Sequence, residues 1–158
     1  MEKSVETTGG PYIRVLGPVL VSRAGSELTL PRSRKVRALL AFLALGAGPV
    51  TRSRLCDLLW DAPNDPRGEL RWCLSKLRTL LDDDQRQRVV SIDNARVALD
   101  LTDCVVDALE IDRLAKDGLD GLPTESLAAL SEKFGGDLLE GVVMDGNPEF
   151  NGWLTAQR

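Results

Sequence analysis

The segment DPRGELRWCLSKLRTLL, residues 65–81, has the periodicity of a single amphipathic helix. With successive residues 100° apart, one side of this helix is apolar and carries Leu70, Cys73, Leu74, Leu77, Leu80 and Leu81. Beside that apolar side lie Arg67, Arg71, Ser75 and Arg78. Opposite its centre lie small residues, Gly68, Ser75 and Thr79, where another molecule can approach the backbone closely. The helix therefore has one side suited to a core and one suited to a partner.

Short strands and two helices are predicted before this segment. YIRVLG (12–17) alternates as a strand, Gly17-Pro18 ends it, and two more antiparallel strands follow in VLVSRAG (19–25) and SELTLP (26–31). Residues 32–45 have the apolar stripe of a helix, which Gly46 to Pro49 ends. Thr51 is a suitable N-cap for a second helix, RSRLCDLLW.

A hairpin and further helices are predicted after it. VVSIDNARVALDL (89–101) alternates on both sides of a polar tip, Asp93 to Arg96, which is a hairpin signal. The periodicity then becomes helical in VVDALEIDRLAKD (105–117), TESLAALSEKF (124–134) and residues 148–158. The last segment has no C-terminal helix signal, so we expect the sequence to be part of a longer protein. A frayed terminal helix in a complete protein is the alternative.

The order of these elements predicts an α+β fold. Helix, helix, short linker, helix and hairpin is the order of a winged helix-turn-helix, here preceded by a small antiparallel sheet and followed by an all-α region. We expect a disordered N-terminal tail at residues 1–10, a winged-helix DNA-binding domain at 11–102 and a helical region at 103–158.

Charge differs sharply between the two parts of the chain. The net charge of −4 combines +4 in residues 1–101, which hold 16 basic and 12 acidic residues, with −8 in residues 102–158, which hold 4 and 12. Within residues 32–78 there are 10 basic and 4 acidic residues. This segregation predicts one part that faces an anion and one that meets proteins.

Several classes of function are disfavoured. The chain has no histidine and no Walker or dinucleotide glycine pattern. The only candidates for catalytic groups are the segment GGDLLEG (135–141) and the carboxylates. We therefore expect neither an enzyme nor a cofactor. Cys56, Cys73 and Cys104 are odd in number and widely spaced, which predicts buried or half-buried thiols rather than a disulfide or metal site. Without a membrane-length apolar run or a signal peptide, we expect a cytoplasmic protein that does not bind membranes.

The motifs also resemble a known family. VTRSRLCDLLW (50–60), the helix at 65–81 and the hairpin ending in VALDL resemble the DNA-binding effector domain of the OmpR/PhoB family. IRVLGPV (13–19), followed by SRKVRALLAFLALGAGPVTRSRL (33–55), is more similar to its branch in the antibiotic regulatory protein (SARP) activators. There an all-helical bacterial transcriptional activator domain follows, and its start resembles VDALEIDRLAK (106–116) with FGGDLLEGVVMDGNPEFNGWLTAQR (134–158). The resemblance covers residues 12–158 and implies that this second domain is truncated or abbreviated.

The resemblance implies that the helix at 65–81 is a recognition helix in a DNA major groove. The residues it places where the family contacts DNA are Arg67, Arg71, Ser75, Lys76 and Arg78. A guanidinium can donate two hydrogen bonds to guanine, and Arg71 is the leading candidate for base readout because it lies on the exposed arc near the N-terminal half of the helix. Arg67, Lys76 and Arg78 flank the exposed arc and are predicted phosphate contacts, while Ser75 stands where relatives often have a basic residue. A solvated surface charge is the alternative for each basic residue.

Two tryptophans are ambiguous in the sequence. Trp72 either touches a thymine methyl or a sugar, or packs under the hairpin, and we favour packing. Trp60 matches a tryptophan of the family, and the resemblance implies that its indole lies near backbone phosphate or supports the following loop. An ordinary core residue is the alternative for Trp60.

Four further residues are candidates for DNA contact outside this helix. Arg52 is expected to donate to a phosphate at the start of the second helix, where the helix dipole and free amides favour anions, and Thr51 is expected to contribute its hydroxyl or amide. Asn94 and Arg96 lie at the hairpin tip and are predicted to enter the adjacent minor groove. A type I′ turn would also explain Asn94.

These expectations combine into a sequence-specific regulator of transcription, an activator by resemblance, that binds double-stranded DNA. The resemblance further implies direct-repeat sites, a homodimer on DNA through the acidic helical region, and contact with RNA polymerase through the loop DAPNDP (61–66). The alternative is a winged-helix module that binds protein or RNA without specific DNA binding, because fold does not fix function.

Overall fold

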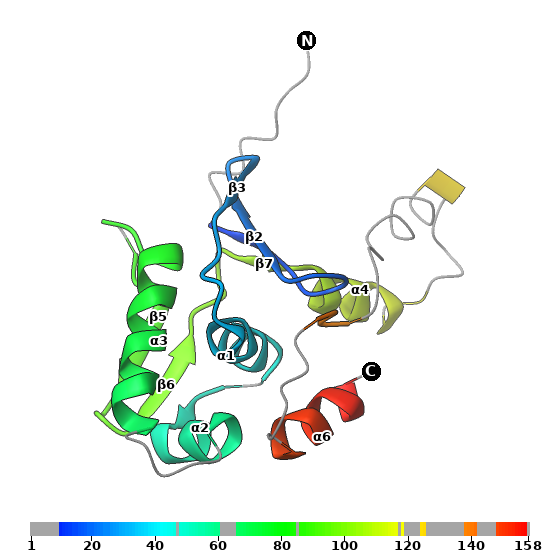
Figure 1. Cartoon of the computed structure of the whole chain (residues 1–158). Helices are drawn as coiled ribbons and strands as arrows, with labels where there is room; N and C mark the ends of the chain where they lie inside the picture. Colours follow the sequence, from blue (N-terminus) through cyan, green and yellow to red (C-terminus); the bar gives the residue numbers. More distant parts are fainter. Residues whose placement is uncertain are drawn as a thin grey trace.

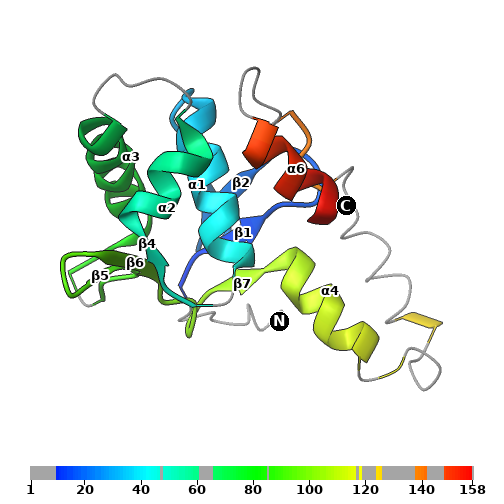
Figure 2. The same ribbon diagram turned by 90° about the horizontal axis from the view of Figure 1, so that it is seen from below.

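The computed structural model describes residues 10–46, 48–60, 66–84, 86–116, 118, 124–125, 138–141 and 148–157. The elements of these residues, in chain order, are β1 (Tyr12–Arg14), β2 (Leu20–Arg23), β3 (Ser26–Leu28), α1 (Arg34–Leu45), β4 (Val50–Thr51), α2 (Arg52–Leu59), α3 (Pro66–Leu81), β5 (Val89–Ile92), β6 (Arg96–Leu99), β7 (Val105–Val106), α4 (Asp107–Lys116) and α6 (Pro148–Gln157). Figures 1 and 2 show α1 at the centre of the molecule, with α2 and α3 packed against it. The predicted α+β winged-helix fold is confirmed.

The first sheet has the strand order β3-β2-β1-β7. The three predicted antiparallel strands are present, and β7 adds a fourth that runs parallel to β1, with Tyr12 opposite Val105. The periodicity predicts a helix from Val105, but α4 begins at Asp107. The reason is that the free edge of β1 offers backbone partners: the Val105 amide donates to the Pro11 carbonyl at 3.2 Å.

The structure confirms the predicted start of α2 and moves the start of α1 by two residues. The Thr51 hydroxyl oxygen accepts from the Arg54 amide at 3.1 Å, which caps α2 as expected. Ser33 caps α1 in the same way through the Val36 amide, so α1 begins at Arg34 rather than at residue 32. A side-chain oxygen therefore satisfies an otherwise unpaired amide at the start of each helix.

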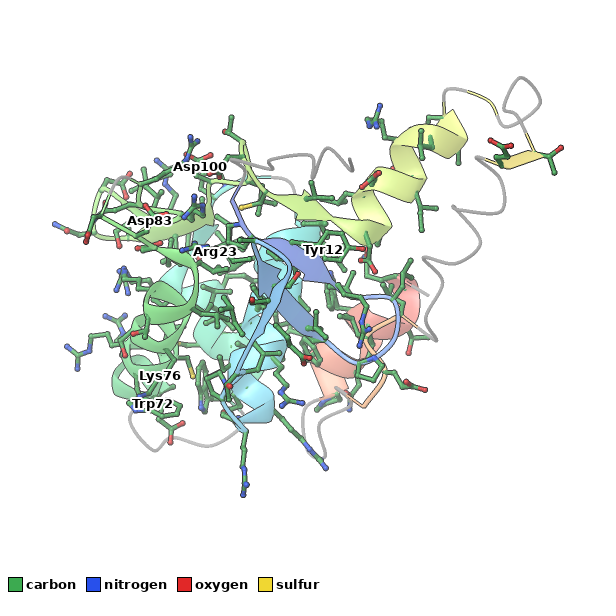
Figure 3. All side chains as sticks on the ribbon, turned by 90° about the horizontal axis from the view of Figure 1, so that it is seen from above. Tyr12, Arg23, Trp72, Lys76, Asp83 and Asp100 are labelled. Atoms are coloured by element: carbon green, nitrogen blue, oxygen red, sulfur yellow. The ribbon has the colours of Figure 1, made fainter. Side chains whose placement is uncertain are left out.

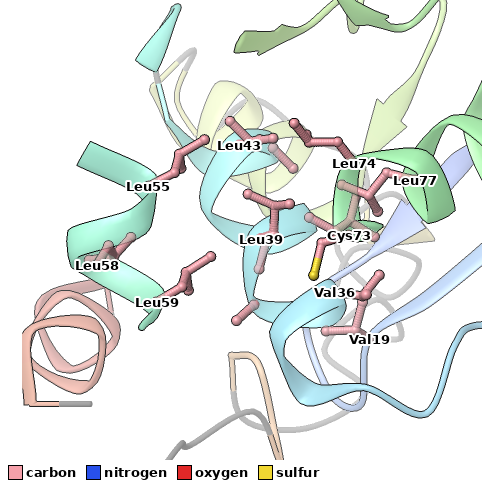
Figure 4. Close-up of a cluster of buried hydrophobic side chains, with 14 of the residues drawn as sticks. Val19, Val36, Leu39, Leu43, Leu55, Leu58, Leu59, Cys73, Leu74 and Leu77 are labelled. Atoms are coloured by element: carbon pink, nitrogen blue, oxygen red, sulfur yellow. The ribbon is translucent and has the colours of Figure 1, made fainter. Parts of the chain in front are cut away.

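The core lies where the three helices meet. Leu39 and Leu43 of α1, Leu55 of α2 and Leu74 and Leu77 of α3 are at most 4% exposed. Figure 4 shows these side chains converging from the three helices. The apolar side predicted for residues 65–81 is therefore the buried side of α3, although Leu80 is only partly buried. Burial of this area provides the main driving force that holds α3 in place.

The predicted hairpin forms a wing beside α3. Strands β5 and β6 pair with each other, and β4 adds to β6 to give a sheet of order β4-β6-β5. Asp93 and Asn94 at the tip have positive φ angles of 47° and 60°, which supports the turn interpretation of Asn94. The Arg52 amide donates to the Ala95 carbonyl at 2.8 Å, so the wing tip is attached to the start of α2.

Segments after residue 102 also pack on this structure. Asp107 is fully buried, and its carboxylate accepts from the Val15 and Leu16 amides at 2.8 and 3.1 Å. On α6, Phe150 and Leu154 are buried against the core, and Trp153 lies 5.0 Å from the ring of Phe42. The predicted helix at 124–134 and the predicted tail lie outside the described residues, except for residues 124–125 and Gly10. No helix in the described part of the chain is long and apolar enough to cross a membrane.

The thiols are unpaired, as predicted. Cys56 and Cys73 are buried and Cys104 is partly buried. Burial is the largest cause that raises the pKa of Cys73 and of Cys104 to about 11. At pH 8 these two groups are therefore protonated in the folded chain.

Because the thiolate is the reactive form, the native chain at pH 8 should react with an aromatic disulfide reagent at least about tenfold more slowly than the chain in denaturant. Absorbance of the released thiolate measures both rates. Rapid modification of Cys73 in the native chain would contradict the burial described above.

A buried arginine links α3 to the wing. Arg88 is 4% exposed, and it bonds to Asp103 at 3.0 and 2.5 Å, to Asp83 at 3.1 Å and to the Leu81 carbonyl at 2.7 Å. Its replacement removes a buried donor from the Leu81 carbonyl and from Asp83 and Asp103, whose side chains are 36% and 24% exposed.

The variant Arg88→Met should lose about 2 to 3 kcal/mol of unfolding free energy, measured by urea denaturation, because the carboxylate partners of Arg88 are partly exposed. The matched control is Arg86→Met, whose side chain is 34% exposed in its pair with Asp100 and should cost about 1 kcal/mol or less. Equal losses in the two variants would show that burial of Arg88 adds nothing.

Candidate nucleic-acid interface

The exposed side of α3 has two edges with different neighbours. Arg67 and Arg71 are exposed and Arg78 is half-buried on the edge that faces the wing. Trp72 and Lys76 are exposed on the other edge, which faces the loop between β3 and α1. Between these edges are the small residues predicted to allow close approach, Gly68, Ser75 and Thr79. The helix therefore presents a shallow strip bordered by cations on both sides.

A groove of about 610 Å³ separates the first edge from the wing; we call it the wing groove. The residues that line it come from α2, α3 and the hairpin, and they are Arg52, Arg67, Leu70, Arg71, Arg78, Ser91 and Asn94. Four of them are arginines, and none of these described residues is acidic. Five of the predicted site residues are thus brought together from segments more than 40 residues apart in sequence. A concave surface of one charge concentrates the opposite charge, so this groove favours an anion.

Ser91 organises two of these arginines, and sequence reasoning missed it. Its hydroxyl oxygen accepts from a terminal nitrogen of Arg52 at 3.1 Å and from one of Arg78 at 3.0 Å. The available signal was a hydroxyl in the otherwise apolar strand VVSI of the predicted hairpin. Pairing with arginines of two helices was not visible in that pattern.

The wing tip holds the other two hairpin candidates. Asn94 lines the wing groove, whereas Arg96 is exposed and bonds to the Asp93 carboxylate at 2.8 Å. This contact is the largest cause that lowers the pKa of Asp93. The Asp93 carboxylate therefore partly balances the charge of Arg96. Asn94 is uncharged and adjoins the wing groove.

The preferred interpretation of Trp72, packing under the hairpin, is wrong. Its side chain is 50% exposed and lies on the edge of α3 away from the wing. The Lys76 ammonium lies 5.4 Å from the centre of the Trp72 ring, and Figure 3 shows both side chains together on the outside of α3. Helical spacing explains this result, because Trp72 is about 100° from both Arg71 and Cys73 and so points away from wing and core alike.

Trp72 and Lys76 border a second open groove of about 690 Å³. Its opposite wall is the β3–α1 segment, which supplies Arg32 and the apolar Leu28, Leu30 and Pro31. Both edges of α3 are therefore basic, and the second edge also carries an exposed aromatic ring.

Trp60 and Thr51 have structural roles. Trp60 is 9% exposed in the core, and the Lys35 ammonium lies 5.0 Å from its ring centre, which supports the core alternative. No described residue accepts from its indole Nε1–H. Thr51 uses its hydroxyl oxygen as the α2 cap, although its side chain stays exposed at the rim where α2 begins. The predicted DNA contacts of both residues stay predictions.

Not every arginine of α2 and α3 lines the wing groove. Arg54, two residues after Arg52 on α2, makes an ion pair with Glu149 of α6. Its charge is balanced within the protein, and it does not line the wing groove. Arg54 therefore offers a matched control for the groove arginines.

Comparison with known proteins supports the fold. No protein-family model and no curated protein sequence matches the chain. Among solved structures, the chain is similar to Mycobacterium tuberculosis EmbR, solved in complex with a low-affinity phosphopeptide, with a TM-score of 0.68 and 20% sequence identity. The similarity covers 94% of this chain and 42% of the EmbR chain, so this chain corresponds to less than half of that protein. The two structures therefore share a fold.

Proposed function

We propose that this chain is a regulator of transcription of the SARP type that binds specific sequences in double-stranded DNA, with α3 in the major groove. The wing groove carries the proposal, because four arginines from two helices face one open surface beside an exposed helix. A duplex is a regular polyanion whose major groove, about 12 Å wide, admits one α-helix.

In this arrangement each edge of α3 faces one border of the major groove. Arg71 is exposed at the start of the wing edge and is assigned to base readout, while Arg67 and Lys76 are assigned to phosphates. Trp72 is exposed on the second edge, where it can contact a sugar or a thymine methyl group. Ser75 lies in the strip between the edges, and its hydroxyl donates to the Trp72 carbonyl at 2.7 Å, so its side chain stays close to the helix.

The other candidates surround this helix. Arg52, Arg78 and Thr51 are assigned to backbone phosphates beside the wing groove, and Asn94 and Arg96 to the neighbouring minor groove, where a narrow groove attracts a guanidinium. Trp60 contributes through its place in the core, behind the start of α3.

The region after residue 102 is assigned to protein contacts, because its charge of −8 repels the same polyanion. Val105 and Leu109 are 38% and 39% exposed and give β7 and α4 an apolar outer surface. The proposal also includes activation through RNA polymerase and a homodimer on direct repeats, which rest on the sequence resemblance. A cytoplasmic location is part of it too and rests on the cysteine pattern and on the sequence having no signal peptide or membrane-length apolar run.

Binding to duplex DNA should weaken steeply with salt. About five phosphate contacts imply a slope near −4.5 in a plot of log affinity against log salt concentration. Selection of bound fragments from genomic DNA with the purified chain, followed by fluorescence anisotropy at several salt concentrations, measures both site and slope. A folded chain that binds no duplex at low salt, or that binds RNA equally well, would refute the proposal.

The base-readout role of Arg71 predicts a loss of specificity. The variant Arg71→Ala should lose about 1 to 3 kcal/mol of binding free energy on the selected site and much less on random DNA. The control variant Arg54→Ala should bind both DNAs as the unchanged chain does, because Glu149 balances Arg54 outside the groove. Equal losses of Arg71→Ala on selected and random DNA would identify Arg71 as a phosphate contact instead.

A further inference from the structure

Ser91, Arg52 and Arg78 meet at one point of the wing groove, and we call these three residues the Ser91 clamp. Arg52 opens α2, Arg78 lies in the last turn of α3, and Ser91 lies within β5. Both guanidinium groups place a nitrogen within 3.1 Å of the same hydroxyl oxygen. The clamp therefore joins α2, α3 and β5 through two cationic side chains and one hydroxyl.

The two guanidinium groups of the clamp differ from other arginines of the chain in their partners. Among the described residues, carboxylates make ion pairs with Arg23, Arg54, Arg86, Arg88 and Arg96. No described carboxylate pairs with Arg52 or Arg78, and a neutral hydroxyl is what holds both groups together. Two like charges brought this close repel each other, so the arrangement gains free energy when an anion joins it.

The remaining hydrogen-bond donors of the clamp suit an anion with several oxygens. A hydroxyl has one donor and two acceptor sites, and both acceptor sites of Ser91 are used by the arginines. Its proton has no described acceptor, and each guanidinium keeps N–H groups beyond the one bonded to Ser91. Because these donors belong to three side chains around one point, they suit a phosphate, which has several oxygens to accept them.

We propose that the Ser91 clamp binds one backbone phosphate of the duplex, and that Ser91 is the positioning residue that sets the two arginines around it. The inference rests on the proposed function, because it takes the phosphate to be a DNA phosphodiester. A phosphate bound in this way contacts α2, α3 and the wing at once. It therefore fixes the distance between the recognition helix and the wing when DNA binds.

Two variants whose new side chains have nearly the same shape test the role of the Ser91 hydroxyl. Ser91→Val and Ser91→Thr both suit a strand, and they differ in whether the hydroxyl is present. Ser91→Val should bind duplex DNA about tenfold more weakly with an unchanged salt slope, because every charge remains, whereas Ser91→Thr should bind within about twofold of the unchanged chain. Arg78→Gln should in contrast reduce the salt slope by about 0.9. Equal binding of the valine and threonine variants would overturn the role of Ser91.

A measurement with inorganic phosphate separates the clamp from the proposed function. Phosphate should shift the NMR signals of the Arg52 and Arg78 Nε–H groups in the unchanged chain and in Ser91→Thr, but not in Ser91→Val. If these signals shift and no duplex binds, the clamp stands and the proposed function fails. If duplex binds and these signals never move, the clamp is wrong. If Ser91→Val does not fold, Arg78→Lys, which keeps the charge but loses the planar fork, should show the same loss of phosphate response.

Discussion

The buried guanidinium of Arg88 is the contact on which the geometry of the candidate interface depends. Its side chain donates to the carbonyl of Leu81 at the end of α3 and to Asp103 after the wing, while its own carbonyl accepts from the Asp100 amide at 2.7 Å. The Asp82 carboxylate completes the connection by accepting from the Arg88 and Val89 amides at 2.7 and 2.9 Å. Because the hydrogen bond with Arg88 lowers the pKa of Asp103, this pair stays charged over the neutral range. The end of α3 and both ends of the wing are thereby held together, and the wing groove lies between them.

The arginines of this chain differ in whether a carboxylate balances their charge. Near the end of α3, Arg86 and Arg88 are matched by carboxylates, and on α2 Arg54 is matched by Glu149. Along the wing groove, Arg52 and Arg78 are instead held by a serine hydroxyl. A carboxylate balances the charge of Arg54, Arg86 and Arg88, whereas the serine hydroxyl leaves the charges of Arg52 and Arg78 uncompensated by any described carboxylate. Exposure alone does not reveal this difference, since Arg78 is only half-exposed.

Local elements were largely predictable, because they depend on contacts between near neighbours in sequence. The predicted helix at 65–81 differs from α3 by one residue, the Thr51 cap is present, and the strands of the hairpin lie on both sides of Asp93 and Asn94. The errors occur where distant segments compete. Val105 and Val106 follow a helical pattern but pair with the edge of β1, and Trp72 faces neither the wing nor the core. Ser91 was missed because its two partners are 39 and 13 residues away in the sequence.

The sequence by itself determined the apolar side of α3, the basic character of residues 32–78 and the order of helices and hairpin, since periodicity and composition are properties of consecutive residues. Tertiary structure alone decided which arginines share a groove. Arg52, Arg71 and Arg78 come together because the wing folds back against α2 and α3, a closure set by the Arg52 amide bonded to Ala95 and by Arg88 at the other end of the wing. Those contacts join residues far apart in the chain, and their geometry follows from the packing of the whole domain.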